Sequence, residues 1–359
     1  MTLRTLPRLI CAVLSLGLCA VEAHAATRVA THGAVLHPHG RTELPGYTGD
    51  FDHFAFDVRG NRLFLAAEDH GTLEVFDLAN GAHLSTLRGV EVPHAPLYLP
   101  SSGRLVVTDS GHGGTKVFDM STGRRIATIP LAPGADSMSF DEATGKMYVV
   151  TGGDNGKLGD SWLARINPRT GRKDGEARIA SNKVEALAVE EKGTRLYVNV
   201  TARNRVDVFN KNTLVLLQSF PLPQGSANAA MAFDEADARL FVVTRKPYRL
   251  RVLDARDGRT LASLPAPQRT NEAIYDRANH RIYLAGDDFL GVVRQDDADH
   301  YTALDPVPTA HGAKTAVLVP QLGRLFVAVS PGEGKSGAAL LSFDVDPAAQ
   351  DTGHPPSSD

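Results

Sequence analysis

FDHFAFDVRGNRLFLAAEDHGTLEVFDLANG, residues 51–81, contains the pattern that decides the fold. Apolar and polar residues alternate at its start, a turn signal follows at Arg59-Gly60-Asn61, and an apolar run leads through a polar break into a second alternating stretch. The segment then ends in a second turn signal, Ala79-Asn80-Gly81. Alternation with a period of two predicts β-strands, and Gly and Asn between such runs predict tight turns. We therefore expect three short antiparallel strands here.

A basic residue directly before an apolar strand recurs along the chain, which shows that this pattern repeats. These anchor positions are Arg62, Arg104, Lys146, Arg195, Arg239, Arg281 and Arg324, with spacings of 42, 42, 49, 44, 42 and 43 residues. A period in the low forties with strand-type alternation is typical of β-propeller blades, each a four-stranded antiparallel sheet. We predict an all-β, seven-bladed propeller that forms a single domain over residues 26–346.

The N-terminal 25 residues have the composition of an export signal. Arg4 and Arg8 precede an apolar core at 9–21, and Ala23-His24-Ala25 fits a cleavage site. This predicts a periplasmic or secreted protein; a lipoprotein signal at Cys19 and a retained membrane anchor are the alternatives. Both cysteines of the chain lie in this segment. The mature protein would then have no disulfide, no thiolate nucleophile and no cysteine-based metal site.

The last repeat has no fourth strand, because only a Pro/Ser/Asp-rich tail follows residues 340–345. We expect the N-terminal run Thr27–Leu36 to pair into this last blade and close the ring. Residues 347–359 have almost no apolar side chains and predict a disordered tail. The formal net charge of -3 argues against nucleic acid and against anionic membrane surfaces as partners. We expect a monomer that has no membrane contact once the signal is removed.

Three second-strand segments resemble a known repeat. MYVVTGG at 147–153, LYVNVTA at 196–202 and LFVVTRK at 240–246 are similar to the YVTN-type repeat of the YncE-like group of exported bacterial β-propellers. The resemblance covers residues 51–346. It implies the fold, but not an activity, because that group mixes binding proteins, surface-layer domains and lactonase-like enzymes.

Polar residues recur at the start of the first strand of each repeat, where a propeller opens into its central channel. Alignment on the anchors gives seven mouth positions: His53, His94, Asp136, Glu185, Ala229, Asn271 and Lys314. Six of the seven are polar, and Asn228 and Glu272 are their direct neighbours. We expect these side chains to meet around the propeller axis and to form a ligand-binding site.

Two interpretations of the mouth positions remain open. His53, His94, Asp136 and Glu185 could hold a divalent metal ion, the one cofactor that the sequence suggests, or could supply general acid and base groups. Alternatively, the positions are polar because water fills the end of the channel.

The loops between second and third strands should lie at the same mouth. They carry His70 and His112 in the first two repeats, and Arg203 and Arg245 in the fourth and fifth. The basic residues favour an anionic ligand. The loop at 152–161 before Trp162 is the longest of the set, and is either a lid or a tolerated surface insertion.

The sequence thus predicts an exported binding protein that recognises a small anionic ligand or a partner at the channel mouth. The alternative is a metal-assisted lactone hydrolase or lyase that uses the same site. A rigid interaction scaffold is a third possibility, and it would not need the polar residues. No single residue stands out as catalytic.

Overall fold

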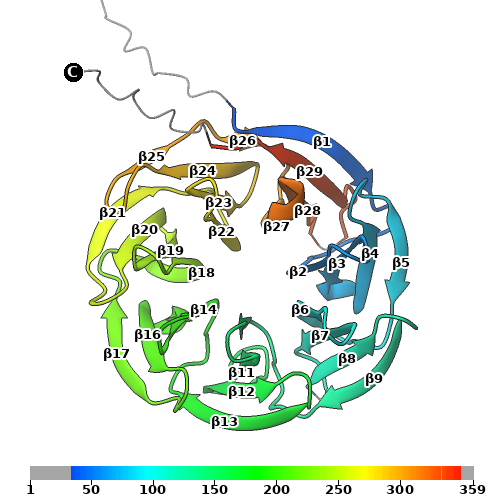
Figure 1. The fold of residues 1–359 in the computed structure, drawn as a ribbon, viewed down its shortest axis with the longest axis horizontal. Coiled ribbons are helices and arrows are strands. Elements are labelled where there is room, and N and C mark those ends of the chain that lie inside the picture. The colour runs from blue at the N-terminus through cyan, green and yellow to red at the C-terminus, as the bar shows by residue number, and fades with distance from the viewer. Residues whose placement is uncertain (1–33, 113, 333, 349–359) are drawn as a thin grey trace, which may run out of the picture. The chain divides into compact units, whose positions relative to one another are not determined.

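The computed structural model describes residues 34–112, 114–332 and 334–348, which form seven antiparallel sheets around a central axis (Figure 1). The predicted seven-bladed, all-β architecture is therefore confirmed. The predicted export signal and most of the predicted tail lie outside the described residues. Within the described part of the chain there is no α-helix, and no helix that could cross a membrane.

Blades 1 to 3 each contain four consecutive strands, which follow one another from the channel outward. Blade 1 consists of β2 (Phe54–Asp57), β3 (Arg62–Ala67), β4 (Thr72–Asp77) and β5 (His83–Leu87). Blade 2 consists of β6 (Pro93–Leu99), β7 (Arg104–Asp109), β8 (Thr115–Asp119) and β9 (Arg124–Ile129). Blade 3 consists of β10 (Met138–Asp141), β11 (Lys146–Gly152), β12 (Ser161–Asn167) and β13 (Arg172–Ile179).

Blades 4 to 6 continue in the same order. Blade 4 consists of β14 (Leu187–Val189), β15 (Arg195–Val200), β16 (Arg205–Asn210) and β17 (Leu216–Pro221). Blade 5 consists of β18 (Ser226–Asp234), β19 (Arg239–Lys246), β20 (Tyr248–Asp254) and β21 (Thr260–Pro265). Blade 6 consists of β22 (Glu272–Asp276), β23 (Arg281–Ala285), β24 (Phe289–Gln295) and β25 (Tyr301–Ala303), and the short β26 (Val307–Pro308) also pairs with β24.

Blade 7 combines strands from both ends of the described chain. It consists of β27 (Thr315–Val319), β28 (Arg324–Val329), β29 (Ala339–Val345) and, outermost, β1 (Leu36–Glu43). Three single-turn 3-10 helices interrupt the loops: η1 (Glu68–His70), η2 (Thr201–Arg203) and η3 (Pro320–Leu322).

The strand that pairs with β29 is not the one we expected. Leu36 pairs with Val345 and Glu43 with Ala339, whereas the predicted run 27–36 lies almost entirely outside the described residues. The sequence of β1, LHPHGRTE, has no apolar alternation, and its pairing is irregular between Pro38 and Gly40. An outermost strand binds mainly through its backbone, so the hydrophobic pattern did not reveal it.

Each anchor residue is the first residue of the second strand of its blade, and most of them connect neighbouring blades. Arg62 donates from Nη1 to the carbonyl of Met120 in blade 2 at 2.7 Å, and Arg324 of blade 7 donates to Ala79 of blade 1 at 2.6 Å. Lys146 differs, because it pairs with Asp174 of its own blade. The basic residue thus recurs because it satisfies a turn carbonyl of the next blade.

The hydrophobic core is divided among the interfaces between blades. Each second strand is buried on both faces, so its alternate side chains contact different neighbours. Leu63 and Leu65 pack with Phe326 of blade 7, whereas Phe64 packs with Phe118 of blade 2. This arrangement explains why the second strands are continuous apolar runs.

Candidate functional site at the channel mouth

All seven mouth positions line one cavity of about 140 Å³. His53, Asn271 and Lys314 come directly before an inner strand, Asp136 and Glu185 come two residues before one, and His94 and Ala229 lie within β6 and β18. Five further residues complete the lining: Asp52, Glu68, Ser137, Asn155 and Ala186. The repeat thus brings one position from each blade to a common space.

A second cavity of about 280 Å³ lies next to the first and shares His53, Ser137 and Ala186 with it. Its other lining residues come from the inner strands and are mostly apolar, for example Met138 and Leu318. The polar mouth therefore adjoins a channel that is mainly hydrophobic.

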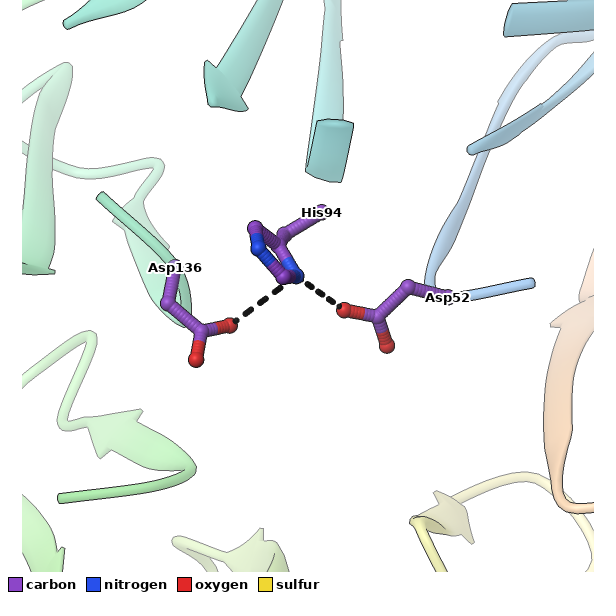
Figure 2. Close-up of side chains that lie close together, drawn as sticks. All are labelled: Asp52, His94 and Asp136. Atoms are coloured by element: carbon purple, nitrogen blue, oxygen red, sulfur yellow. Dashed lines mark hydrogen bonds and ion pairs between the residues drawn. The ribbon is translucent and has the colours of Figure 1, made fainter. Parts of the chain in front are cut away.

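Carboxyl and imidazole groups alternate along one side of the mouth cavity. His53 contacts Glu272 through Nδ1 at 2.8 Å and Asp52 through Nε2 at 3.5 Å. The other carboxylate oxygen of Asp52 lies 2.8 Å from His94 Nδ1, which is also 3.6 Å from Asp136 Oδ1 (Figure 2). The chain of contacts runs from blade 6 through blades 1 and 2 to blade 3.

The carboxylates stabilise positive charge on both imidazoles. Burial by itself lowers the pKa of His53, but Asp52 and Glu272 outweigh it and raise that pKa to about 10. For His94, burial is outweighed by Asp136 and by the hydrogen bond to Asp52, and the pKa also rises to about 10. Conversely, burial raises the pKa of Asp52, but His53 and His94 outweigh it and lower that pKa to about 2.

Other carboxyl groups of the cavity are less well compensated. Burial, together with the nearby negative charge of Asp52, raises the pKa of Glu68 to about 7. Burial also raises the pKa of Asp136, and burial with the charge of Asp136 raises that of Glu185. Negative charge is therefore crowded in this space.

Hydrogen bonds hold the outward-facing atoms of the central side chains. His94 Nε2 lies 2.9 Å from Ser110 Oγ, and Asn155 donates its amide N–H to Asp136 Oδ2 at 2.7 Å. Asn271 donates to Asp52 Oδ1 at 3.4 Å. Asn155 belongs to the long loop at 152–161, so this loop contributes a side chain to the cavity.

Several residues that we expected at the mouth lie outside this cavity. His70 accepts a hydrogen bond from the Thr48 amide, and His112 is fully exposed beside Glu91. Arg203 donates to the carbonyl of Ala180.

The other expected residues support the mouth from nearby. Arg245 donates to Asn271 Oδ1 at 2.8 Å and so positions a lining residue from behind. Asn228 is fully buried and bonds to Asn199, and Glu272 lines the deeper cavity.

Asp52, Glu68 and Asn155 line the cavity but were not predicted. Alternation would turn Asp52 away from its neighbour His53, yet β2 begins only at Phe54, and both side chains reach the cavity. Glu68 is brought there by η1, a single turn in which the sequence drew attention only to the histidine. No periodic pattern predicts the position of a loop residue such as Asn155.

One group of side chains has the arrangement of metal ligands. Within the described part of the chain, the only set of three or more His, Asp or Glu residues with potential ligand atoms within 4.8 Å of one another is Asp52, His94 and Asp136. Of the four predicted ligands, His94 and Asp136 belong to it. His53 is bound to Glu272, and Glu185 lies 3.3 Å from Lys183.

Comparison with known proteins identifies the fold but not a family. No protein-family model and no curated protein sequence matches the chain. A chain of the solved structure titled "Crystal Structure of Mitotic Checkpoint Complex" superposes with a TM-score of 0.71 at 16% identity, covering 94% of this chain and 100% of that one. The chain is a β-propeller.

This architecture is very common, since 1623 chains of solved structures match the chain. A fold so widely shared does not determine function, which must be argued from the site. The resemblance to the YVTN-type repeat, the export signal and the periplasmic or secreted location therefore stay predictions.

Proposed function

We propose that this protein is an exported binding protein whose ligand occupies the mouth cavity. One observation carries the proposal: equivalent positions of all seven blades line this cavity, and six of them are polar. The neighbouring channel cavity is lined mostly by apolar side chains. A concave site with converging polar groups beside an apolar space is the usual form of a small-molecule site.

The charges of the cavity favour a cationic ligand group. Four carboxyl groups line it, those of Asp52, Glu68, Asp136 and Glu185. The three basic groups of the lining already contact carboxylates: His53 contacts Glu272, His94 contacts Asp52, and Lys314 donates to Asp50 at 2.6 Å.

The basic residues that suggested an anion, Arg203 and Arg245, do not line the cavity. We therefore replace the anionic ligand by a small cation, or by a ligand with one cationic group. The volume of about 140 Å³ agrees with a small group, because sites for drug-sized molecules usually measure roughly 300–1,000 Å³.

Two further candidates use the same face. A protein partner is favoured by the structural neighbour, whose title places it in a complex. Catalysis, as a metal-assisted lactone hydrolase or lyase, is favoured by the imidazole and carboxyl groups that converge on one cavity, because such groups can transfer protons.

The proposal can be tested by blocking the cavity without changing its charge. Ala229 is buried and lines the cavity, so Ala229→Leu should fill part of it, whereas Ala143→Leu adds the same group to an exposed turn of blade 3. Thermal shifts should be measured with ethanolamine, choline and putrescine, and with acetate and succinate as an anionic series. A cation at 100 times its Kd should stabilise the protein by about 2.7 kcal/mol.

We expect the cations to stabilise the wild type and Ala143→Leu, but not Ala229→Leu. An equal response of the two variants would contradict the location of the site. A response to anions alone would contradict the class of ligand. Hydrolysis of δ-lactones by the wild type would support the catalytic candidate instead.

A further inference from the structure

We propose that Asp52, His94 and Asp136 bind one divalent metal ion at the channel mouth. The inference deepens the proposed function, because it names the cation that the cavity takes, and it rests on that same cavity. The three side chains come from blades 1, 2 and 3 and point toward one another (Figure 2).

The distances among the three ligand atoms fit a single ion. His94 Nδ1 lies 2.8 Å from Asp52 Oδ2 and 3.6 Å from Asp136 Oδ1, and each of the three residues offers a ligand atom within 4.8 Å of those of the other two. Metal bonds of about 2.0–2.2 Å to nitrogen and oxygen place neighbouring ligand atoms roughly 3–4 Å apart. An ion could therefore enter with small rotations of the side chains and no movement of the strands.

In each of the three ligands, the polar atom that does not face the others contacts a further residue. This observation is independent of the distances among the ligand atoms. Ser110 contacts the other ring nitrogen of His94, Asn155 binds the other oxygen of Asp136, and Asn271 binds the other oxygen of Asp52. Metal-binding sites usually have such partners, which orient each ligand and leave one of its atoms directed at the ion. In this cavity the three remaining atoms are those that converge.

The carboxylates around His94 favour a metal ion. Two carboxylates flank His94 Nδ1, and His94 is only 4% exposed. A positive charge between these carboxylates is required to offset their repulsion in a buried site. A divalent ion would provide this charge, and Glu68 and Glu185 line the same cavity.

The ligand types indicate the class of metal. One imidazole and two carboxylates suit first-row ions such as Zn²⁺ or Mn²⁺, whereas Ca²⁺ and Mg²⁺ favour sites made of oxygen alone. Three protein ligands leave at least one coordination position for water or for a small molecule in the cavity. A hydroxyl oxygen of a small molecule could take this position.

The test is metal binding by the full chain after treatment with a chelator. Equilibrium dialysis against Zn²⁺ followed by elemental analysis should give one ion per chain, and Ca²⁺ should not compete at equal concentration. Asp136→Asn should weaken binding by more than about 100-fold, since even the loss of a residue that only orients a ligand costs about 10–100-fold. Ser110→Ala, which removes a residue that orients His94, should weaken Zn²⁺ binding by about 10–100-fold.

Glu185→Gln is the matched control, because it neutralises a carboxyl of the same cavity outside the three ligands. It should weaken Zn²⁺ binding far less than Asp136→Asn does, because it removes a nearby negative charge but no ligand atom. The proposal is overturned if the wild type binds no Zn²⁺, or if Glu185→Gln weakens binding as much as Asp136→Asn does. If Asp136→Asn does not fold, unchanged binding by Ser110→Ala overturns it instead.

Failure of the metal site can be distinguished from failure of the proposed function. Zn²⁺ binding is measured without any organic ligand, and the thermal shifts with organic cations can be repeated in the presence of the chelator. If the chain binds no Zn²⁺ but the thermal shifts with organic cations persist, the metal site is refuted and the cavity remains a binding site. If Ala229→Leu responds to the organic cations like the wild type, the cavity itself is refuted as the binding site.

Discussion

Asp141→Asn should destabilise the propeller strongly, because it breaks a buried ion pair between blades 3 and 4. Asp141 is the last residue of β10, and its Oδ2 lies 2.9 Å from Lys211 Nζ. Asp141 is fully buried and Lys211 is 3% exposed. Asparagine can keep the hydrogen bonds that Asp141 Oδ1 accepts from the amides of Ala143 and Thr144, so the main effect is a buried ammonium without its counter-charge. Such a change costs about 3–5 kcal/mol.

A double variant separates the charge from the packing. Asp141→Asn with Lys211→Met removes the ammonium as well, and replacing both partners of a buried pair is often nearly neutral. We therefore expect urea unfolding to show a smaller loss of free energy for the double variant than for Asp141→Asn alone. A single variant that loses less than about 1 kcal/mol, or a double variant that is no more stable than it, would refute this reasoning.

The same pair predicts a pH dependence. Burial by itself raises the pKa of Asp141, but the hydrogen bonds from Lys211 and Thr144 outweigh it and lower that pKa below its ordinary value of 3.8. A carboxyl with a lowered pKa stabilises the folded state at pH values above its unfolded pKa, and this stabilisation is lost as the pH falls through the folded pKa. The stability difference between the wild type and Asp141→Asn should thus shrink below about pH 4.

Two further predictions concern ring closure and the long loop. Leu36→Ala in β1 removes a buried side chain from the core between blades 6 and 7, and should lower the free energy of unfolding in urea by about 2–5 kcal/mol. His37→Ala, on the exposed side of the same strand, should change it little. Equal losses of stability in the two variants would mean that β1 does not pack on this core. Gly152→Ala should strain the loop that carries Asn155, because Gly152 has a φ of +79° and an added Cβ would lie 2.6 Å from Trp162. Since Trp162 is the only tryptophan, its fluorescence should shift, and an unchanged spectrum with unchanged stability would show that the loop tolerates the extra group.

Much of the fold could be predicted because a simple physical need recurs in every blade. Each second strand is buried on both faces and begins with a residue that, in most blades, binds a carbonyl of the next blade, so the run "basic residue then apolar strand" is visible seven times. The strand β1 escaped detection for the opposite reason. Only Leu36 of its eight residues is buried, so its pairing depends on backbone groups that every residue possesses.

The lining of the mouth cavity could be predicted only where it follows the repeat. His53, His94 and Asp136 could be found because equivalent blade positions face the same axis. Asp52 and Glu68 could not, because their placement depends on where a strand begins and on a single 3-10 turn. The ionisation of the histidines also needed the structure, because it depends on which carboxylates lie within a few ångström of them.

The position of β1 in blade 7 has a consequence for any ligand of the mouth. The cavity exists only while all seven blades stay in place, and the pairing of β1 with β29 is what joins the two ends of the described chain. A ligand that contacts several blades therefore binds only the closed ring and shifts the balance between closed and opened rings in proportion to its affinity. Occupancy of the mouth should then be measurable at a distance, as slower amide hydrogen exchange in β1 and β29.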